Sequence, residues 1–278
     1  MNALTIDVED YFHVTAFEKY VSKKNWDSYP LRVVENTLHI LDILDKFAVK
    51  ATFFILGWVA ERRPSLVREI HARGHEIACH GYGHELIYRI GIDNFREDLR
   101  KAKKILEDIS GYKIKGYRAP SYSITKDSLW AFDILIEEGF LYDSSIFPVM
   151  HDIYGIPQAK RFPNDIVTKA GVIKEFPMST LQIKLASRKI CIPVAGGGYL
   201  RLFPLWFIKK AIKSINTAEC QPAVIYFHPW EMDYEQPRIK AGLKSTFRHY
   251  INLKQTTGKI IGLLSSCEFV PMKTVLGV

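Results

Sequence analysis

The amino-acid sequence predicts an α/β protein with a mainly parallel sheet and helices outside it, either open or closed into a barrel. Segments with the period of a strand alternate with segments with the period of a helix, which is typical of repeated βα units. At 278 residues, with 47% hydrophobic and 24% charged residues, the chain can bury a large core. We find no internal repeat and no low-complexity linker, so we expect one domain over residues 1–278.

The first part of the chain contains five strand-like runs separated by four helical segments. The strand-like runs, rich in apolar and β-branched residues, are residues 3–10, 50–57, 75–81, 114–120 and 141–145. Apolar residues recur at helical spacing in residues 31–47, 64–74, 94–111 and 126–139. Pro64 near a helix start, and glycines 74, 111 and 139 at helix ends, are the residues expected at these boundaries.

From about residue 150 to 203 the pattern changes to hairpin-like segments rich in glycine and proline. The stretch AGGGYLRLFP (195–204) lacks the GK[ST] of a phosphate-binding loop, so we expect a loop whose backbone lies close over a cleft. The alternation of strand-like and helical segments then resumes. We expect a helix at 204–215, a strand at 222–231, a helix between about 238 and 255, and a last strand near 260–270.

The chain has a formal net charge of +8, which favours a basic surface or an anionic partner. Lys209, Lys210 and Lys213 lie near Trp206 and Phe207, a combination that suits peripheral contact with an anionic membrane. No nucleic-acid-binding motif accompanies the charge, so we expect no nucleic acid partner.

The four cysteines are far apart and form no CxxC pair, so the sequence predicts neither a zinc knuckle nor a disulfide framework. The N-terminus lacks a basic region followed by an apolar region, and no apolar run reaches 18 residues. We therefore expect neither a signal peptide nor a membrane span, and these features favour the cytoplasm.

Two clusters of chemically active residues follow strand-like runs. His80 and His84 are four residues apart, so two neutral imidazoles can bind one metal ion if the backbone turns helically there. Asp7, Glu9 and Asp10 end the first strand-like run, where three carboxylates repel one another unless a cation offsets them. Two histidines and one carboxylate leave positions open for water and substrate, which indicates a catalytic metal site.

Three further polar residues follow other strand-like runs: Arg118, Asp143 and His228. In a parallel barrel the carboxyl ends of the strands meet at one face, where the chemistry takes place. We therefore expect these residues to lie with the two clusters, as parts of a metal-assisted hydrolase.

The order of these motifs resembles the polysaccharide deacetylase family, the NodB-homology domain of family 4 carbohydrate esterases. Five segments resemble the family's five motifs: TIDVED (Thr5–Asp10), HGYGH (His80–His84), GYRAPSY (Gly116–Tyr122), YDSS (Tyr142–Ser145) and YFHPWE (Tyr226–Glu231). The resemblance spans roughly residues 1 to 270 and implies a distorted (β/α)7-type barrel with extra β-hairpin segments. The opening DVEDYFHV resembles a branch associated with exopolysaccharide and surface-glycan gene clusters.

The resemblance also implies a mechanism, a metal-dependent hydrolysis of the acetamide of an N-acetylated sugar. Asp7 matches the family's catalytic base, His228 matches its catalytic acid, and His80 and His84 match its metal-binding histidines. Zinc is the expected metal, although cobalt, nickel or manganese would also suit two histidines and one carboxylate. The substrate would be a glycan, a glycolipid intermediate or a nucleotide sugar.

Two supporting residues and one open choice complete the implied site. Arg118 is expected to hold Asp7 ionised, and Asp143 to orient His228. The usual first motif has two adjacent aspartates, whereas Val8 follows Asp7 here, so either Glu9 or Asp10 is the carboxylate ligand. Residues 7 and 9 share a face of a strand, which favours Glu9, but a turn after Val8 would bring in Asp10.

Two alternative functions remain open. One is hydrolysis of a cyclic amide by an allantoinase-like enzyme of the same fold group. The other is carbohydrate binding without catalysis on a degenerate deacetylase scaffold. The presence of both histidines argues against the first, and intact Asp7 and His228 argue against the second.

Overall fold

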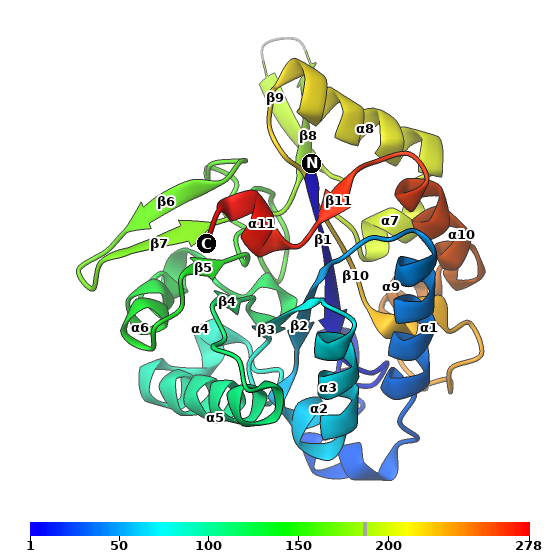
Figure 1. Ribbon diagram of the computed structural model, residues 1–278. Coiled ribbons are helices and arrows are strands. Elements are labelled where there is room, and N and C mark those ends of the chain that lie inside the picture. The colour runs from blue at the N-terminus through cyan, green and yellow to red at the C-terminus, as the bar shows by residue number, and fades with distance from the viewer. Residues whose placement is uncertain (186–187) are drawn as a thin grey trace.

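A curled, mainly parallel sheet forms the centre of the computed structural model, which describes residues 1–185 and 188–278 (Figure 1). Its strands lie in the order β10-β1-β2-β3-β4-β5-β7-β6, and β11 also pairs with β1. All pairings in this sheet are parallel except that of β6 with β7. The strands are β1 Asn2–Val8, β2 Thr52–Ile55, β3 Glu76–Cys79, β4 Gly116–Tyr117, β5 Tyr142–Asp143, β6 Asn164–Val167, β7 Val172–Glu175, β10 Val224–Phe227 and β11 Phe269–Val270.

Helices surround this sheet, and most of them follow a strand as βα units require (Figure 1). The helices are α1 Val33–Lys46, α2 Gly57–Arg62, α3 Pro64–Ala72, α4 Ile87–Ile90, α5 Ile92–Ser110, α6 Ala131–Glu137, α7 Gly198–Leu202, α8 Leu205–Ala218, α9 Leu243–Tyr250, α10 Leu253–Leu264 and α11 Met272–Leu276. None of the helices in residues 1–185 and 188–278 is both long and apolar enough to cross a membrane.

The first strand holds the two ends of the chain together. β1 lies between β10 and β2, and every residue of β1 is buried. A strand covered on both faces reads as a nearly continuous apolar run, as ALTI does. β10 comes from the last quarter of the chain, yet it pairs with β1 in parallel. The residues that follow β1 and β10 therefore leave the sheet at the same edge.

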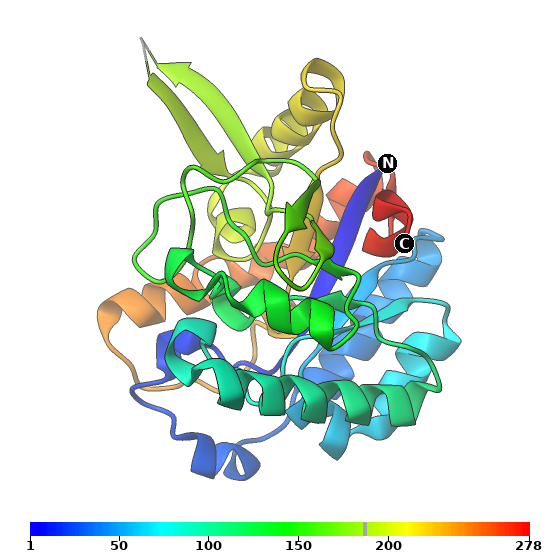
Figure 2. The same cartoon turned by 90° about the vertical axis from the view of Figure 1, so that its left-hand side faces the viewer.

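A separate hairpin, β8 (Thr180–Leu185) with β9 (Arg188–Pro193), stands outside this sheet and projects beyond the body next to α8 (Figure 2). The glycine-rich segment that follows returns to the sheet, where Gly196 forms a parallel bridge with Tyr226. A Cβ on Gly196 would lie 1.8 Å from the Tyr226 carbonyl oxygen, so only glycine fits this close approach.

The structure confirms the predicted α/β barrel-like fold and the hairpins after residue 150. It differs near the C-terminus. The helix predicted between 238 and 255 is two helices, α9 and α10, because Asn252 between them is left-handed (φ 54°). The last strand is only β11, because the apolar residues 260–264 continue α10. The short helices α2, α4, α7 and α11 were not predicted.

Candidate metal centre and active site

Three buried side chains at the carboxyl ends of β1 and β3 are grouped as a metal ion would require. One ligand atom from each of Glu9, His80 and His84 lies within 4.8 Å of the others. Glu9 follows β1, and the two histidines follow β3. In the sheet, β1 and β3 lie on either side of β2. Two imidazoles and one carboxylate form a donor set suited to zinc and other divalent first-row metals.

Hydrogen bonds orient both histidines. The Nδ1–H of His80 donates to the Arg118 carbonyl oxygen (2.8 Å), which leaves Nε2 as the ligand atom. Nε2 of His84 lies 2.7 Å from Oε2 of Glu9, and His84 itself is left-handed (φ 52°). The loop between the histidines is held by Asp98, which accepts from the N–H groups of Tyr82 (2.7 Å) and Gly83 (3.0 Å).

The protonation states also fit a cation. Burial lowers the pKa of His80 to about 4, so its imidazole is neutral at pH 7. Burial alone would raise the pKa of Glu9, but the charge and hydrogen bond of His84, with the charges of His228 and His80, lower it well below the ordinary range. Oε2 of Glu9 is buried and faces Nε2 of His84 at 2.7 Å, within the group of candidate ligand atoms. A carboxylate oxygen in this state is suited to a metal ligand.

The structure does not bring Asp10 into this group. Its carboxylate points to the start of α1, where Oδ2 accepts from the N–H groups of Arg32 (2.7 Å) and Val33 (2.9 Å). Oδ1 accepts from the N–H of Tyr11 (2.9 Å). Asp10 therefore satisfies backbone donors at a helix N-terminus, and the geometry favours Glu9 as the carboxylate ligand.

Replacing Asp10 by alanine is expected to destabilise the fold while leaving metal affinity nearly unchanged. The substitution leaves three backbone N–H groups without their acceptor, which should cost about 1–3 kcal/mol. Urea unfolding and zinc titration of the same preparation measure the two quantities. Glu9→Gln is the matched control and should show the reverse pattern. A large loss of zinc affinity in folded Asp10→Ala protein would contradict the assignment.

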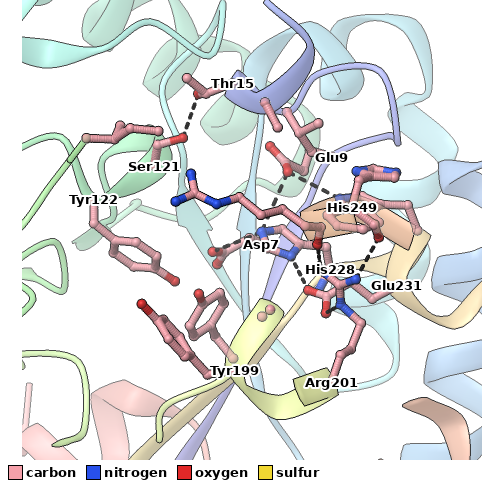
Figure 3. A pocket seen from close by; sticks show the side chains of 18 of the residues that line it. Asp7, Glu9, Thr15, Ser121, Tyr122, Tyr199, Arg201, His228, Glu231 and His249 are labelled. Atoms are coloured by element: carbon pink, nitrogen blue, oxygen red, sulfur yellow. Dashed lines mark hydrogen bonds and ion pairs between the residues drawn. The ribbon is translucent and has the colours of Figure 1, made fainter. Parts of the chain in front are cut away.

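Asp7 lies next to His228 in the cleft (Figure 3) and is paired with Arg118. Nη1 of the fully buried Arg118 donates to Oδ1 of Asp7 (2.7 Å) and to the hydroxyl of Thr5 (2.8 Å). The other guanidinium nitrogens bond to the carbonyl and hydroxyl oxygens of Ser144. These contacts fix Arg118 against Asp7 and hold the Asp7 carboxylate in the position where a general base could act.

His228, from the end of β10, faces both acids. Its Nε2 lies 3.6 Å from Oε1 of Glu9 and 3.9 Å from Oδ2 of Asp7. Burial would lower the pKa of His228, but the hydrogen bond from Nδ1 to Glu231 and the charges of Glu9, Glu231 and Asp7 raise it to about 9. His228 is therefore protonated at pH 7 in this environment, as a general acid must be.

Glu231 and Arg201 are two site residues that we did not predict as such. Glu231 lies one 3-10 turn after His228, and its side chain bonds to both the ring and the backbone N–H of His228. Nε of Arg201 donates to its other oxygen (2.8 Å), and both residues are buried. The signal was present in HPWE, because an acidic residue three positions after a helix cap commonly bonds back to it.

Asp143 does not lie where we expected it. Oδ1 and Oδ2 of Asp143 accept from the hydroxyl and N–H of Ser145, and no hydrogen bond or ion pair of the described residues joins Asp143 to His228. The Ser145 hydroxyl in turn accepts from the N–H of Ala119 (2.8 Å). Asp143 thus supports the loop that carries Arg118, and Glu231 is the carboxylate on His228.

Asp143 also shares a proton with Glu175, which predicts a pH dependence of stability. Burial, followed by the charge of Asp143, raises the pKa of Glu175 well above 4.5, so Glu175 keeps its proton to a higher pH than an exposed glutamate does. A raised carboxyl pKa stabilises the fold below the unfolded value, and this stability is lost as the pH rises through the folded value.

Glu175→Gln should therefore flatten the alkaline side of the stability profile. An amide keeps the hydrogen bond to Asp143 and can still accept from the Ile146 N–H, but it has no proton to lose. Relative to the variant, the wild type should lose up to about 1.4 kcal/mol per pH unit above pH 4.5. Urea unfolding from pH 5 to 9 measures both curves, and parallel curves would disprove the shared proton.

The candidate residues line a cleft of 480 Å³. Its aromatic wall includes Tyr122, Tyr199 and Tyr226. Ser121 and Tyr122 are both left-handed (φ 51° and 54°), a strained conformation that is concentrated at functional sites. The hydroxyls of Ser121 and Thr15 lie 2.7 Å apart across the cleft (Figure 3). The Tyr122 N–H is bonded to the Ala119 carbonyl, so the Ser121 N–H is the better candidate oxyanion donor.

Comparison with known proteins finds similar families over two separate parts of the chain. Residues 19–133 match the family model described as "Polysaccharide deacetylase", and residues 144–277 match a "Domain of unknown function (DUF3473)". Each match covers less than half of the chain, and the first agrees with the resemblance of the motifs to the polysaccharide deacetylases. The matched deacetylase segment contains His80, His84 and Arg118, whereas Asp7 and His228 lie outside it.

Individual relatives agree over part of their length. A peptidoglycan-N-acetylglucosamine deacetylase of Bacillus cereus is 39% identical over 99 residues, which is 35% of this chain and 36% of that protein. A peptidoglycan deacetylase-like protein of Gibberella zeae is 34% identical over 130 residues, 46% of this chain and 37% of that protein. The chain thus spans little more than a third of the length of these two relatives.

Solved structures agree over nearly the whole chain. A Mycobacterium smegmatis protein assigned to the polysaccharide deacetylases has a TM-score of 0.63 at 21% identity, covering 99% of this chain and 88% of that one. The PuuE allantoinase has a TM-score of 0.58 at 14% identity, with 96% and 85% covered. A CE4 family pseudoenzyme from Bacillus anthracis has a TM-score of 0.51 at 15% identity, with 99% and 65% covered. At such identities the likeness establishes the fold alone.

Proposed function

We propose that this protein is a metal-dependent N-deacetylase that hydrolyses the acetamide of an N-acetylated sugar. One observation carries the proposal. The grouped side chains of Glu9, His80 and His84 lie beside a buried acid, Asp7, and a protonated imidazole, His228. This arrangement contains each group that metal-assisted amide hydrolysis needs. The deacetylase names of the relatives support the same activity.

Glu9, His80 and His84 would hold a divalent ion, which we propose to be zinc, with cobalt, nickel or manganese as alternatives. Such an ion, when bound, lowers the pKa of a bound water and polarises a carbonyl oxygen. The buried, neutral imidazole of His80 and the buried carboxylate of Glu9 fit that role. The expected carboxylate ligand is therefore Glu9, and Asp10 has a structural role.

The protein's own groups divide the proton transfers between them. Asp7, held in position by Arg118, removes a proton from the attacking water. His228, kept protonated by Glu231, donates a proton to the departing amine nitrogen. The backbone N–H of Ser121 stabilises the oxyanion that forms between these two steps. Asp143 takes part only by supporting the loop of Arg118.

The substrate that we propose is an N-acetylated sugar in a glycan, a glycolipid or a nucleotide-sugar intermediate of surface-glycan synthesis. The cleft is open at its outer end and is lined by aromatic rings, which pack well on sugar faces. We also propose that residues 1–278 act as a single domain. Ligands follow β1 and β3 while the acid follows β10, so both matched segments contribute to one site.

Acetate release tests the proposal directly. The protein should release acetate from at least one member of a panel of N-acetylated sugars and oligosaccharides. A chelator should abolish this release, and added zinc or cobalt should restore it. Glu9→Gln, His80→Ala and His84→Ala proteins, checked for folding by circular dichroism, should bind less metal and lose activity together. Activity that is unchanged after complete metal removal would overturn the proposed mechanism.

The same assay separates the two alternatives. An allantoinase-like enzyme would open a cyclic amide without releasing acetate, and an allantoin substrate measured in parallel tests this. A carbohydrate-binding protein without catalysis would bind oligosaccharide by calorimetry yet release no acetate with any metal. The pseudoenzyme of the same fold makes that control necessary.

A further inference from the structure

One face of the molecule, away from the candidate metal centre, is both basic and apolar. We call it the α8–hairpin face. Its exposed side chains are Ile183, Lys184, Lys189, Ile190, Leu202, Trp206, Lys210 and Lys213. Hairpin β8–β9 and helix α8 contact each other and project from the same end of the molecule in both views (Figures 1 and 2).

The charge of this face is unbalanced. Between Glu175 and Glu219 the chain contains no aspartate or glutamate, although it contains several lysines and arginines. Lys184, Lys189, Lys210 and Lys213 take part in no ion pair among the described residues. Glu219, which follows α8, is already bound to Arg161. These four lysines of the hairpin and helix, together with Lys209, therefore present uncompensated positive charge.

The apolar part of this face is aromatic and exposed. Trp206 is 66% exposed, whereas Trp26, Trp58 and Trp230 are buried. Trp206, Lys210 and Lys213 are spaced i, i+4 and i+7, so they form one stripe along α8. The isoleucines Ile183 and Ile190 are directly opposite each other and give the hairpin an apolar side, and the next pair, Lys184 and Lys189, extends from its other side.

A row of aromatic rings connects this face with the cleft. Tyr199 lines the cleft and stacks on Phe203, whose ring is 4.9 Å from that of Phe207. Phe207 in turn contacts Trp206, with 5.9 Å between ring centroids. A partner that binds to α8 would therefore lie next to helix α7, which carries Tyr199 at the wall of the cleft.

We propose that the α8–hairpin face docks on an anionic lipid bilayer. An exposed tryptophan and two isoleucines can enter the interfacial region of a bilayer, while unpaired lysines contact acidic headgroups. Lysine stems extend along apolar surface and leave their ammonium groups at headgroup level. Charge complementarity thus favours a negative lipid surface over a second copy of this basic chain. The face contains none of the candidate catalytic residues, so docking is independent of the proposed deacetylation.

Vesicle binding tests this proposal with the whole chain. The protein should sediment with phosphatidylglycerol–phosphatidylcholine vesicles and should not sediment with phosphatidylcholine alone. Tryptophan emission should shift to shorter wavelength on binding, and Trp206→Phe should remove the shift. The double variant Lys210→Glu/Lys213→Glu should bind at least about tenfold more weakly. Lys46→Glu/Lys126→Glu, at exposed lysines of other elements, is the matched control and should bind like the wild type.

Other outcomes would overturn the proposal. Equal binding to neutral and anionic vesicles would show that the α8–hairpin face does not recognise anionic lipid. Equal loss of vesicle binding in both double variants would show that this face is not the binding site. Self-association that Ile190→Lys abolishes, without vesicle binding, would assign the face to a second copy. Binding of DNA in place of vesicles would assign it to nucleic acid. A chelator should leave vesicle binding unchanged, so failure here and failure of the proposed deacetylase activity can be told apart.

Discussion

Asp7→Asn protein should lose acetate release by about 10²- to 10⁴-fold in kcat while binding metal as well as the wild type does. Asparagine has the same shape as aspartate and can still accept the hydrogen bond from Arg118 through its amide oxygen. It cannot take a proton from water. Because Asp7 is not one of the three grouped ligands, the substitution removes a base without removing a metal ligand.

The measurement is kcat for acetate release alongside zinc content of the same preparation. Glu9→Gln is the control, because Glu9 leaves the same end of β1 but belongs to the ligand group. It should lose zinc and activity in proportion. If Asp7→Asn protein lost zinc in the same proportion, Asp7 would be a ligand and the proposed division of labour between the two acids would be wrong.

Much of this fold follows from the periodicity of the sequence. The five strand-like runs and four helices before residue 145 all have counterparts, because buried parallel strands read as apolar runs and their covering helices are amphipathic. The C-terminal part was harder to predict. Asn252 breaks one apolar pattern into two helices by adopting a left-handed backbone, which asparagine permits but does not require.

In the candidate site, too, some features could be predicted from the sequence and others could not. Strand ends could be predicted, and they brought Asp7, His80 and His228 into one cleft, with Arg118 bonded to Asp7. The choice between Glu9 and Asp10 could not be settled, because it depends on where β1 stops. The strand ends at Val8, yet Asp10 turns toward α1, because the backbone donors that begin that helix lie there.

Contacts between distant segments were not predictable either. Arg201 reaches Glu231 and also donates to the carbonyl oxygens of residues 248, 249 and 251. These contacts depend on how α7 packs against the last turn of α9 and the residue that follows it, and no spacing rule encodes that. As a consequence, the Glu231 carboxylate beside His228 is paired with a fixed cation, the guanidinium of Arg201.

Glu231→Gln should lower activity at alkaline pH far more than at neutral pH, and His228→Asn should lower it by about 10²- to 10⁴-fold at every pH. A protonated His228 is needed to release the amine, so activity falls as the pH rises through its pKa. Burial opposes the charge on His228, and the hydrogen bond with Glu231 is the largest effect that raises the pKa, to about 9. A cation beside Glu9 offsets that residue's contribution, whereas Glu231 keeps its own.

In the pH profile of kcat, the midpoint of the alkaline limb should therefore lie above pH 6.5 in the wild type. In Glu231→Gln protein this midpoint should move toward pH 6.5, the ordinary pKa of histidine. Arg201→Lys is the informative companion, because it keeps a cation near Glu231 but loses the planar contacts that hold it. It should shift the limb less than Glu231→Gln does. A limb that stays fixed in Glu231→Gln protein, with an unchanged acidic limb, would show that His228 draws its charge from Asp7 and Glu9 alone.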